Sequence, residues 1–197
     1  MTAPTVHAVV LAAGAGRRLG GAVPKHLVAV RGSPMLEHVL RALLGSRVIS
    51  TTVVVRADDT PGAVLARRLG AAVCSPEDPG EGRAASIRAG AAAAPQDVTG
   101  LLFVPADQPR LESADFDALV DAHATGADIA HASYDGVRGT PVLFAVQHRP
   151  RLLALRGEEG GRVLLERYPA GRVAVALPPA HGRDVDTPED LAALESG

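Results

Sequence analysis

The sequence is poor in the residues that characterise several common classes of protein. Its 197 residues include no tryptophan, two tyrosines, three phenylalanines and a single cysteine, Cys74. So few aromatic rings leave little to stack on a single-stranded nucleic acid, and a net charge of −2 offers no basic excess for binding a phosphate backbone. One cysteine excludes a disulfide within the chain and is typical of a cytoplasmic protein.

Long apolar runs are also missing. None approaches the roughly 18 residues that a membrane span needs. The first apolar stretch, residues 6–11, has no basic segment before it and continues into glycines, so we expect a buried strand rather than a signal peptide. We therefore predict a cytoplasmic protein with no membrane and no nucleic acid among its partners. The length suits one sizeable core, and residues 1–197 are predicted to form a single domain.

Strand-like and helix-like segments take turns along the chain. Apolar, β-branched runs predict strands at 6–11, 52–55, 71–74, 100–104, 128–132, 141–146 and 173–177. Helix-like stretches lie between them at 34–44, 60–69, 83–94, 112–124, 147–155 and 160–167, and a last helix begins near residue 187. This alternation predicts an α/β fold of three layers, α/β/α, with a mostly parallel central sheet covered on both faces.

Ligands of such sheets bind beyond the carboxyl ends of the strands. Three loops with suggestive chemistry are expected at that edge, at residues 12–25, 105–110 and 182–188. The segments 75–82 and 133–140 are predicted to be further loops over the site, because they are rich in residues that favour turns.

The first of these loops combines glycines with cationic side chains. Gly14, Gly16 and Gly20 follow the first strand, with Arg18 among them and Lys25 after them. Glycines allow backbone N–H groups to converge on an anion, and the two cations neutralise charge that the amides alone cannot. The pattern favours a polyphosphate pocket, and the alternative is a structural turn that happens to be rich in glycine.

Two better-known phosphate loops do not fit this stretch. A dinucleotide fingerprint needs glycine where this chain has Leu19, and an acidic residue after the second strand, where it has Arg56. A P-loop needs Gly-Lys-Ser/Thr, but Lys25 lies between Pro24 and His26. A dinucleotide-binding oxidoreductase is therefore disfavoured.

Several segments become recognisable when they are taken together. The first loop reads Leu-Ala-Ala-Gly-x-Gly-x-Arg-x-Gly from Leu11 and is followed by Pro24-Lys25. The others are residues 82–90, 106–109, 138–144 and 184–191. In this order they resemble the MobA-like NTP transferases over nearly the whole chain, in particular the molybdenum cofactor cytidylyltransferases. The resemblance implies a glycosyltransferase-A-like fold, with a mixed, mostly parallel sheet and a Rossmann-like nucleotide-binding half.

The same resemblance implies an activity and a set of residues. It implies a nucleotidyltransferase that moves an NMP from an NTP bound to Mg²⁺ (or Mn²⁺) to a phosphorylated acceptor and releases pyrophosphate. The nucleotide-binding residues it implies are Leu11, Ala12, Ala13, Gly14, Ala15, Gly16, Arg18, Lys25, Gly82, Ser86 and Asp107. Catalytic roles are implied for Arg18, Lys25 and Asp107. On the acceptor side it implies Arg138, Gly139, Pro141 and Arg162, the last of which is alternatively a solvated surface arginine.

Two aspartates are candidates for holding the metal. Divalent cations take oxygen ligands, often one or two carboxylates together with phosphate oxygens and water. Asp107 follows the strand at 100–104, and the resemblance makes it the first ligand, whereas the alternative is a turn aspartate. Asp186 is the second candidate, with Asp184 as its rival or supporting neighbour. The alternative for Asp186 is a helix start at Thr187-Pro188.

The sequence also bears on which base the NTP carries and on which phosphorylated molecule accepts the NMP. Ala13 and Asp186 favour CTP over GTP, because guanylyl-type relatives carry glycine and asparagine at the matching positions. The resemblance makes molybdopterin the first candidate for the acceptor. The spacing from Gly20 to Lys25 instead resembles cytidylyltransferases of methylerythritol phosphate and sugars, so methylerythritol phosphate, phospholactate or a sugar phosphate is the alternative. A non-catalytic nucleotide-binding protein on the same fold is a further alternative, disfavoured by the pair of aspartates.

Overall fold

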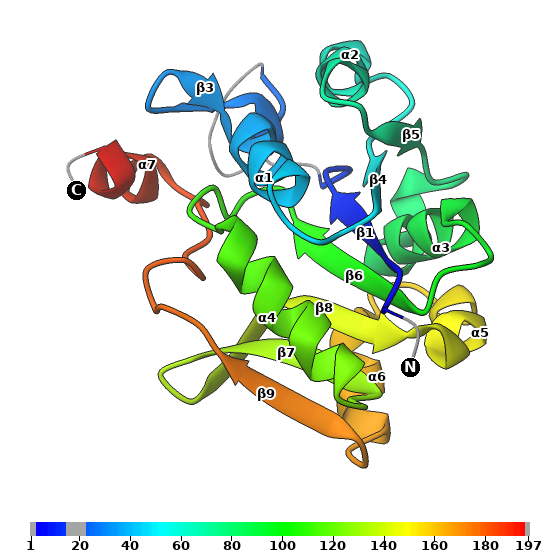
Figure 1. Ribbon diagram of the computed structural model, residues 1–197. Helices are drawn as coiled ribbons and strands as arrows, with labels where there is room; N and C mark the ends of the chain where they lie inside the picture. Colours follow the sequence, from blue (N-terminus) through cyan, green and yellow to red (C-terminus); the bar gives the residue numbers. More distant parts are fainter. Residues whose placement is uncertain (1–2, 15–22, 196–197) are drawn as a thin grey trace.

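The computed structural model describes residues 3–14 and 23–195, arranged around one central sheet (Figure 1). The sheet has seven strands in the order β5-β4-β1-β6-β8-β7-β9. Their bounds are β1 Val6–Leu11, β4 Ser50–Val54, β5 Ala72–Cys74, β6 Gly100–Pro105, β7 Ile129–Tyr134, β8 Val137–Ala145 and β9 Arg172–Ala176. Neighbouring strands pair in parallel except β8, which is antiparallel to both β6 and β7. The predicted mixed, mostly parallel sheet is confirmed.

Helices cover both faces of this sheet. Their bounds are α1 Met35–Leu44, α2 Thr60–Arg68, α3 Arg83–Ala93, α4 Ser113–Ala124, α5 Arg149–Leu153, α6 Gly161–Arg167 and α7 Pro188–Glu195. Side chains alternate between the faces along a strand, so Val6, Ala8 and Val10 of β1 pack with α1, α2 and α4, while Val9 packs with α3, α5 and α6. The three predicted layers follow from this alternation.

One glycine sets how closely a helix approaches the sheet. A Cβ atom on Gly90 of α3 would lie 2.2 Å from Cγ1 of Val9 in β1. No side chain fits there, so the small residue brings α3 directly onto the strand that leads into the glycine-rich loop.

The prediction of a loop over residues 133–140 is wrong. Most of this segment is the β7–β8 hairpin, closed by Asp135 and Gly136, which both have positive φ (49° and 79°). A two-residue turn of this kind matches the twist of the flanking strands, and Asp-Gly is a preferred sequence for it. The single helix expected at 147–155 is divided into the short turn η4 (Val146–His148) and α5.

Smaller elements near Lys25 were not predicted. The 3₁₀ turn η2 spans Lys25–Leu27, and β2 (Ala29–Val30) pairs with β3 (Ser33–Pro34) in a separate hairpin. Another 3₁₀ turn, η3 (Pro79–Glu81), lies within the segment expected to be a loop before α3. In the part of the chain that the structure describes, no helix is long and apolar enough to cross a membrane.

The strand directions bring the functional loops to one edge of the sheet. Strands β1, β6 and β9 end at this edge, and β8 begins there because it runs the opposite way. The segment after β9 then crosses back toward the centre of the sheet. It is fixed there by Val185, whose side chain is fully buried with Val30, Met35 and Leu194, and whose N–H donates to the carbonyl oxygen of Asp107 at 3.1 Å.

Candidate functional site

Three side chains from distant parts of the sequence meet at the carboxyl edge of the sheet. The Nζ atom of Lys25 donates a short hydrogen bond to Oδ2 of Asp107 and another, of 2.7 Å, to Oδ1 of Asp186. Lys25 opens η2, Asp107 follows β6, and Asp186 lies just before α7. The two aspartates predicted to share a cation therefore converge on one positively charged atom.

These contacts keep the Lys25 side chain protonated. Its side chain is 14% exposed, and burial by itself lowers the pKa of an ammonium group. The hydrogen bonds and the negative charges of Asp107 and Asp186 outweigh this effect, so the pKa of Lys25 is raised. Lys25 is also the only lysine of the chain, which contains 19 arginines. An ammonium group is a compact charge with three rotatable donors, and it fits between two carboxylates where a planar guanidinium would need more room.

The structure distinguishes the roles of the neighbouring acidic residues. At the start of helix α7, Asp190 accepts from the N–H groups of Asp186 at 3.0 Å and Thr187 at 2.8 Å, and Thr187 Oγ1 accepts from the N–H of Asp190 at 3.2 Å. The carboxylate of Asp186 instead reaches Lys25. Asp184, its rival, accepts a hydrogen bond from Nε2 of Gln108 at 2.9 Å. Although Asp184 as a residue is exposed, partial burial of its carboxyl group and the charge of Asp107 raise its pKa.

The donor set fits a divalent cation bound together with a nucleotide. Asp107 and Asp186 offer two carboxylates aimed at one point, which is the usual protein contribution to a magnesium site shared with phosphates. Among the described residues, no group of three or more histidine, cysteine, aspartate or glutamate side chains is arranged to hold a metal ion alone. Phosphate oxygens and water commonly supply the further ligands of such a magnesium site.

The start of the glycine-rich loop lies beside Asp107. The carbonyl oxygen of Leu11 accepts from the N–H of Ala106 at 3.2 Å, and the N–H of Ala12 donates to the carbonyl oxygen of Val54 at 2.8 Å. Ala13 is half-buried and Gly14 is exposed at the same edge. The predicted residues Ala15, Gly16 and Arg18 lie outside the described part of the chain.

Gly82 and Ser86 follow β5 at the same edge, on the other side of β1. Gly82 has φ +89°, and a Cβ atom there would lie 2.5 Å from Oε1 of Glu158 and 2.7 Å from the carbonyl oxygen of Gly157. Ser86 is half-buried in the first turn of α3. The turn before α3 is thus packed against the 157–158 segment, which links the predicted nucleotide side to the predicted acceptor side.

The predicted acceptor residues occupy β8 and α6. Arg138 Nη2 and Arg162 Nε both donate to Oε1 of Glu166, at 3.3 and 2.8 Å. The two arginines are therefore brought together around one carboxylate, and the hydrogen bond from Arg162 lowers the pKa of Glu166. Gly139 lies against the ring of Tyr134, and Pro141 is buried.

With this geometry in view, comparison with known proteins gives the family. Residues 8–173 match the MobA-like NTP transferase domain. The chain belongs to this family. It is therefore an enzyme of the nucleotidyltransferase class, with a glycosyltransferase-A-like fold, and NTPs and phosphorylated acceptors are the typical substrates of MobA-like NTP transferases.

Curated relatives of this MobA-like NTP transferase carry different names. A 2-C-methyl-D-erythritol 4-phosphate cytidylyltransferase from Streptomyces coelicolor is 33% identical over 202 residues, which cover 95% of this chain and 72% of that protein. A second such enzyme, from Streptomyces avermitilis, is 37% identical over 61% of this chain, a match that spans half of its own length. The purine catabolism protein PucB of Bacillus subtilis is 30% identical, with 96% of both chains covered.

Solved structures agree with the fold. Rv0371c from Mycobacterium tuberculosis is 26% identical, with a TM-score of 0.84 over the whole of both chains. The same protein in complex with manganese has a TM-score of 0.78 at 24% identity, covering 98% of this chain and 99% of that one. The molybdopterin-guanine dinucleotide biosynthesis protein A of Archaeoglobus fulgidus, 22% identical over 96% of this chain and 97% of its own, has a TM-score of 0.69. A likeness at that identity shows the fold alone, so the comparisons support the family but not its molybdenum cofactor branch.

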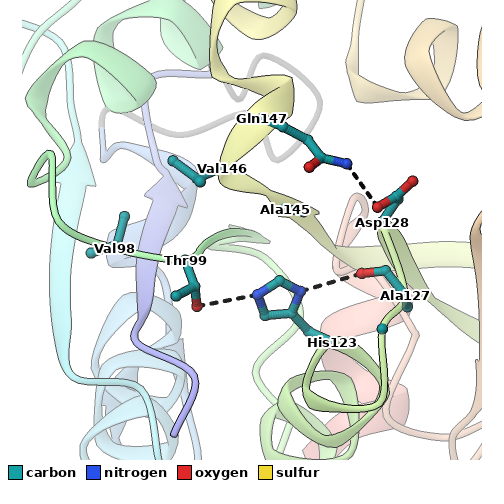
Figure 2. Close-up of a pocket in the computed structure, with 9 residues that line it drawn as sticks. Val98, Thr99, His123, Ala127, Asp128, Ala145, Val146 and Gln147 are labelled. Atoms are coloured by element: carbon teal, nitrogen blue, oxygen red, sulfur yellow. Dashed lines mark hydrogen bonds between the residues drawn. The ribbon is translucent and has the colours of Figure 1, made fainter. Parts of the chain in front are cut away.

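A hollow of about 280 Å³ lies at the opposite edge of the sheet and is separate from this site. Figure 2 shows its polar lining, in which His123 contacts Thr99 and the carbonyl oxygen of Ala127, and the amide of Gln147 points at Asp128. These polar side chains are therefore already engaged in hydrogen bonds within the protein.

Sequence reasoning missed the residues that support the predicted ones. Gln108 holds Asp184, Glu166 joins the two arginines, and His26 contacts Asp59. For Gln108 a signal was present, since it lies beside Asp107 in a segment that carries the resemblance. Nothing in the sequence around Glu166 distinguishes it from an ordinary surface acid, and Asp59, before Thr60-Pro61, shows only the pattern of a helix N-cap.

Proposed function

We propose that the chain transfers CMP from CTP to a phosphorylated small molecule and releases pyrophosphate. The observation that carries the proposal is the convergence of Asp107 and Asp186 on Nζ of Lys25, beside the start of the glycine-rich loop. An arrangement of two carboxylates and one cation suits a reaction in which a metal-bound triphosphate must be gripped, and a protein that only binds nucleotide has less need of it.

The proposed roles follow from charge and position. Asp107 and Asp186 hold Mg²⁺ or Mn²⁺, which when bound neutralises charge on the triphosphate. Lys25, the amides of the glycine-rich loop and Arg18 hold the phosphates, while Gly82 and Ser86 border the base and ribose. An oxygen of the acceptor phosphate forms a bond to the α-phosphorus, and the bond from this phosphorus to the bridging oxygen breaks, so that pyrophosphate leaves with the electron pair. An ionised phosphate needs no strong general base, so positioning and charge stabilisation supply most of the rate.

Lys25 changes partners in this scheme. Without nucleotide its ammonium group neutralises the two aspartates, and with nucleotide it turns to the phosphates and leaves the carboxylates to the metal. The raised pKa of Lys25 supports the first of these two states, because it keeps the ammonium group charged beside the two aspartates.

The acceptor side is proposed to lie on β8 and α6. Arg138 and Arg162 converge on Glu166, which marks a place where two guanidinium groups meet one anion. We propose that the acceptor phosphate takes over one or both arginines from Glu166, with Gly139 and Pro141 shaping the approach.

For the acceptor itself, methylerythritol phosphate ranks first. The cytidylyltransferase of this compound from Streptomyces coelicolor is 33% identical over 95% of this chain, and the spacing from Gly20 to Lys25 supports the same reading. Molybdopterin ranks second, on Ala13 and the Asp-Val-Asp-Thr-Pro stretch that begins at Asp184.

Two measurements test the proposal. Thermal shift with CTP, GTP, ATP and NAD, each with and without Mg²⁺, is expected to show the largest stabilisation with CTP and Mg²⁺. Pyrophosphate release is then followed with methylerythritol phosphate, phospholactate, sugar phosphates and molybdopterin, with Asp107→Asn as the inactive control. Binding of CTP without turnover on any acceptor would identify a nucleotide-binding accessory protein, and stabilisation by NAD alone would overturn the proposal.

A further inference from the structure

A buried pair of side chains begins at His26, the residue that follows Lys25. His26 and Asp59 are 4% and 6% exposed, and Nε2 of His26 lies 2.7 Å from Oδ2 of Asp59. In the tautomer that carries its proton on Nε2, His26 donates this hydrogen bond to the side chain of Asp59. The other oxygen, Oδ1, accepts from the N–H of Gly62 at 3.0 Å, because Asp59 is the N-cap of α2. The pair therefore ties η2, which begins at Lys25, to the first turn of α2.

The surroundings leave this pair little freedom. A Cβ atom on Gly62 would lie 2.3 Å from Oδ2 of Asp59 and 2.8 Å from Nε2 of His26, so only glycine allows the two side chains to meet there. Burial lowers the pKa of His26, while the charge of Asp59 and the hydrogen bond to it act in the opposite direction. A buried polar pair of this kind is costly to break, since the partner left behind keeps its desolvation penalty.

A fixed backbone at Lys25 would reduce the ordering that nucleotide binding requires. Its side chain is long and flexible, and in the proposed function it has to exchange two carboxylates for phosphate oxygens. A rigid anchor one residue away confines this exchange to rotation of the side chain, so that little ordering is left to be done when the nucleotide binds.

We propose that His26 and Asp59 are positioning residues for Lys25, fixing η2 so that the ammonium group moves between the carboxylates and the nucleotide phosphates without a backbone shift. The proposal rests on the proposed function, because it assigns the purpose of the anchor to phosphate binding by Lys25. A purely structural pair would stabilise the fold without affecting Lys25 in particular.

The single lysine makes a direct test possible. Protein labelled only with ¹⁵N-lysine gives one backbone amide signal and one Nζ signal, both from Lys25. We expect His26→Gln to broaden or shift both signals and to reduce the order of the amide. His7→Gln is the matched control, because His7 is also buried, with Nδ1 2.7 Å from Oγ of Ser50 and Nε2 3.0 Å from Oγ1 of Thr52, at the opposite end of β1. The control is expected to lower stability and leave the Lys25 signals unchanged.

Binding of CTP and Mg²⁺, measured by calorimetry well below the melting temperature, gives the second readout. We expect His26→Gln to raise Kd about tenfold, and His7→Gln to change it less than about twofold, since misplacement of a binding group by about 1 Å is costly. In a Lys25→Met background, His26→Gln is expected to add almost nothing. Should His26→Gln fail to fold, Asp59→Asn serves instead, because asparagine is also a good N-cap and keeps the acceptor for Gly62.

The outcomes separate the two claims. If Lys25→Met weakens binding while His26→Gln and Asp59→Asn bind like the parent protein, the positioning role is wrong and the proposed function stands. Full additivity between His26→Gln and Lys25→Met, or equal effects of His26→Gln and His7→Gln on the Lys25 signals, would also overturn the positioning role. If Lys25→Met itself binds CTP and Mg²⁺ as the parent does, the proposed function fails, and the positioning role fails with it.

Discussion

The side-chain amide of Gln108 donates one hydrogen bond to the carboxylate of Asp184 at 2.9 Å and another to the carbonyl oxygen of Gly182 at 3.1 Å. Gln108 is buried and adjoins Asp107, whereas Gly182 and Asp184 belong to the segment that carries Asp186. Together with the hydrogen bond from Val185 to Asp107, this amide joins the loop after β6 to the loop after β9. This connection places Asp107 beside the segment that carries Asp186.

The first prediction concerns this connection. Gln108→Leu removes the amide that donates to Asp184 and to Gly182, so we expect turnover to fall by about 10- to 100-fold, because the second aspartate loses its position. Gln147→Leu is the control, since its amide donates to Asp128 at 2.7 Å on the opposite edge of the sheet. Steady-state kinetics of both variants checks the expectation, and equal activity of Gln108→Leu and the parent would contradict it.

The second prediction concerns competition between Lys25 and the metal. Because the ammonium group lies between Asp107 and Asp186, a free divalent cation has to displace it. Lys25→Met is therefore expected to bind Mn²⁺ without nucleotide about tenfold more tightly, as read by electron paramagnetic resonance, and to lose turnover by about 10²- to 10³-fold. Lys25→Arg keeps the charge and should not gain Mn²⁺ affinity. An unchanged Mn²⁺ affinity in Lys25→Met would argue against a shared site.

The third prediction concerns Glu166 and the arginines. Glu166→Gln removes the charge that Arg138 and Arg162 now share, so we expect KM for the phosphorylated acceptor to fall about threefold and KM for CTP to stay constant. Arg138→Gln is expected to raise KM for the acceptor. If both substitutions alter only the KM for CTP, the acceptor site lies elsewhere.

The fourth prediction concerns pH and His7. Burial, aided by the charge of Arg149, lowers the pKa of His7 from 6.5 to about 4 in the folded protein. Between these values the unfolded chain binds more protons, so the free energy of unfolding falls as the pH drops from about 6.5 to about 4, by about 3 kcal/mol in total for this group. Urea unfolding at a series of pH values should show a shallower pH dependence in His7→Gln. Identical slopes for the parent and the variant would contradict the prediction.

The fifth prediction concerns Gly82. In Gly82→Ala the new Cβ atom is strained by the positive φ of +89° and also clashes with Glu158 and Gly157. In Gly70→Ala only the positive φ of +78° causes strain, because no atom lies within 4 Å of the new Cβ atom. We expect the control to cost about 1 kcal/mol of unfolding free energy, and Gly82→Ala to cost more and to raise KM for CTP. The comparison isolates the contact between the turn before α3 and the 157–158 segment, and equal costs would show that this contact is unimportant.

Much of the fold was predictable because local patterns determine it. Alternating apolar strands and helices indicated a mostly parallel sheet, the family resemblance implied that it is mixed, and the order of the strands brought the loops after β1, β6 and β9 to one edge. The 133–140 hairpin was misread although Asp135-Gly136 is a strong turn signal. The expectation of a loop gave too much weight to glycine and too little to the strands on either side.

The candidate site was predictable only in part. The resemblance singled out Lys25, Asp107 and Asp186, and the structure brings these three side chains together. The contact of Gln108 with Asp184 spans 76 positions, and that of His26 with Asp59 spans 33. Such pairs depend on how loops cross in space, and a single sequence carries no pattern for them.

The path of the chain after β9 has a consequence for biosynthesis and turnover. A nascent chain that has left the ribosome only as far as Ala176 contains every strand of the sheet but lacks Asp186. A protease that cuts once between Leu177 and Gly182 and lets the tail depart leaves the same species. Such a species would retain β1, β6 and the side chain of Asp107 without the second carboxylate.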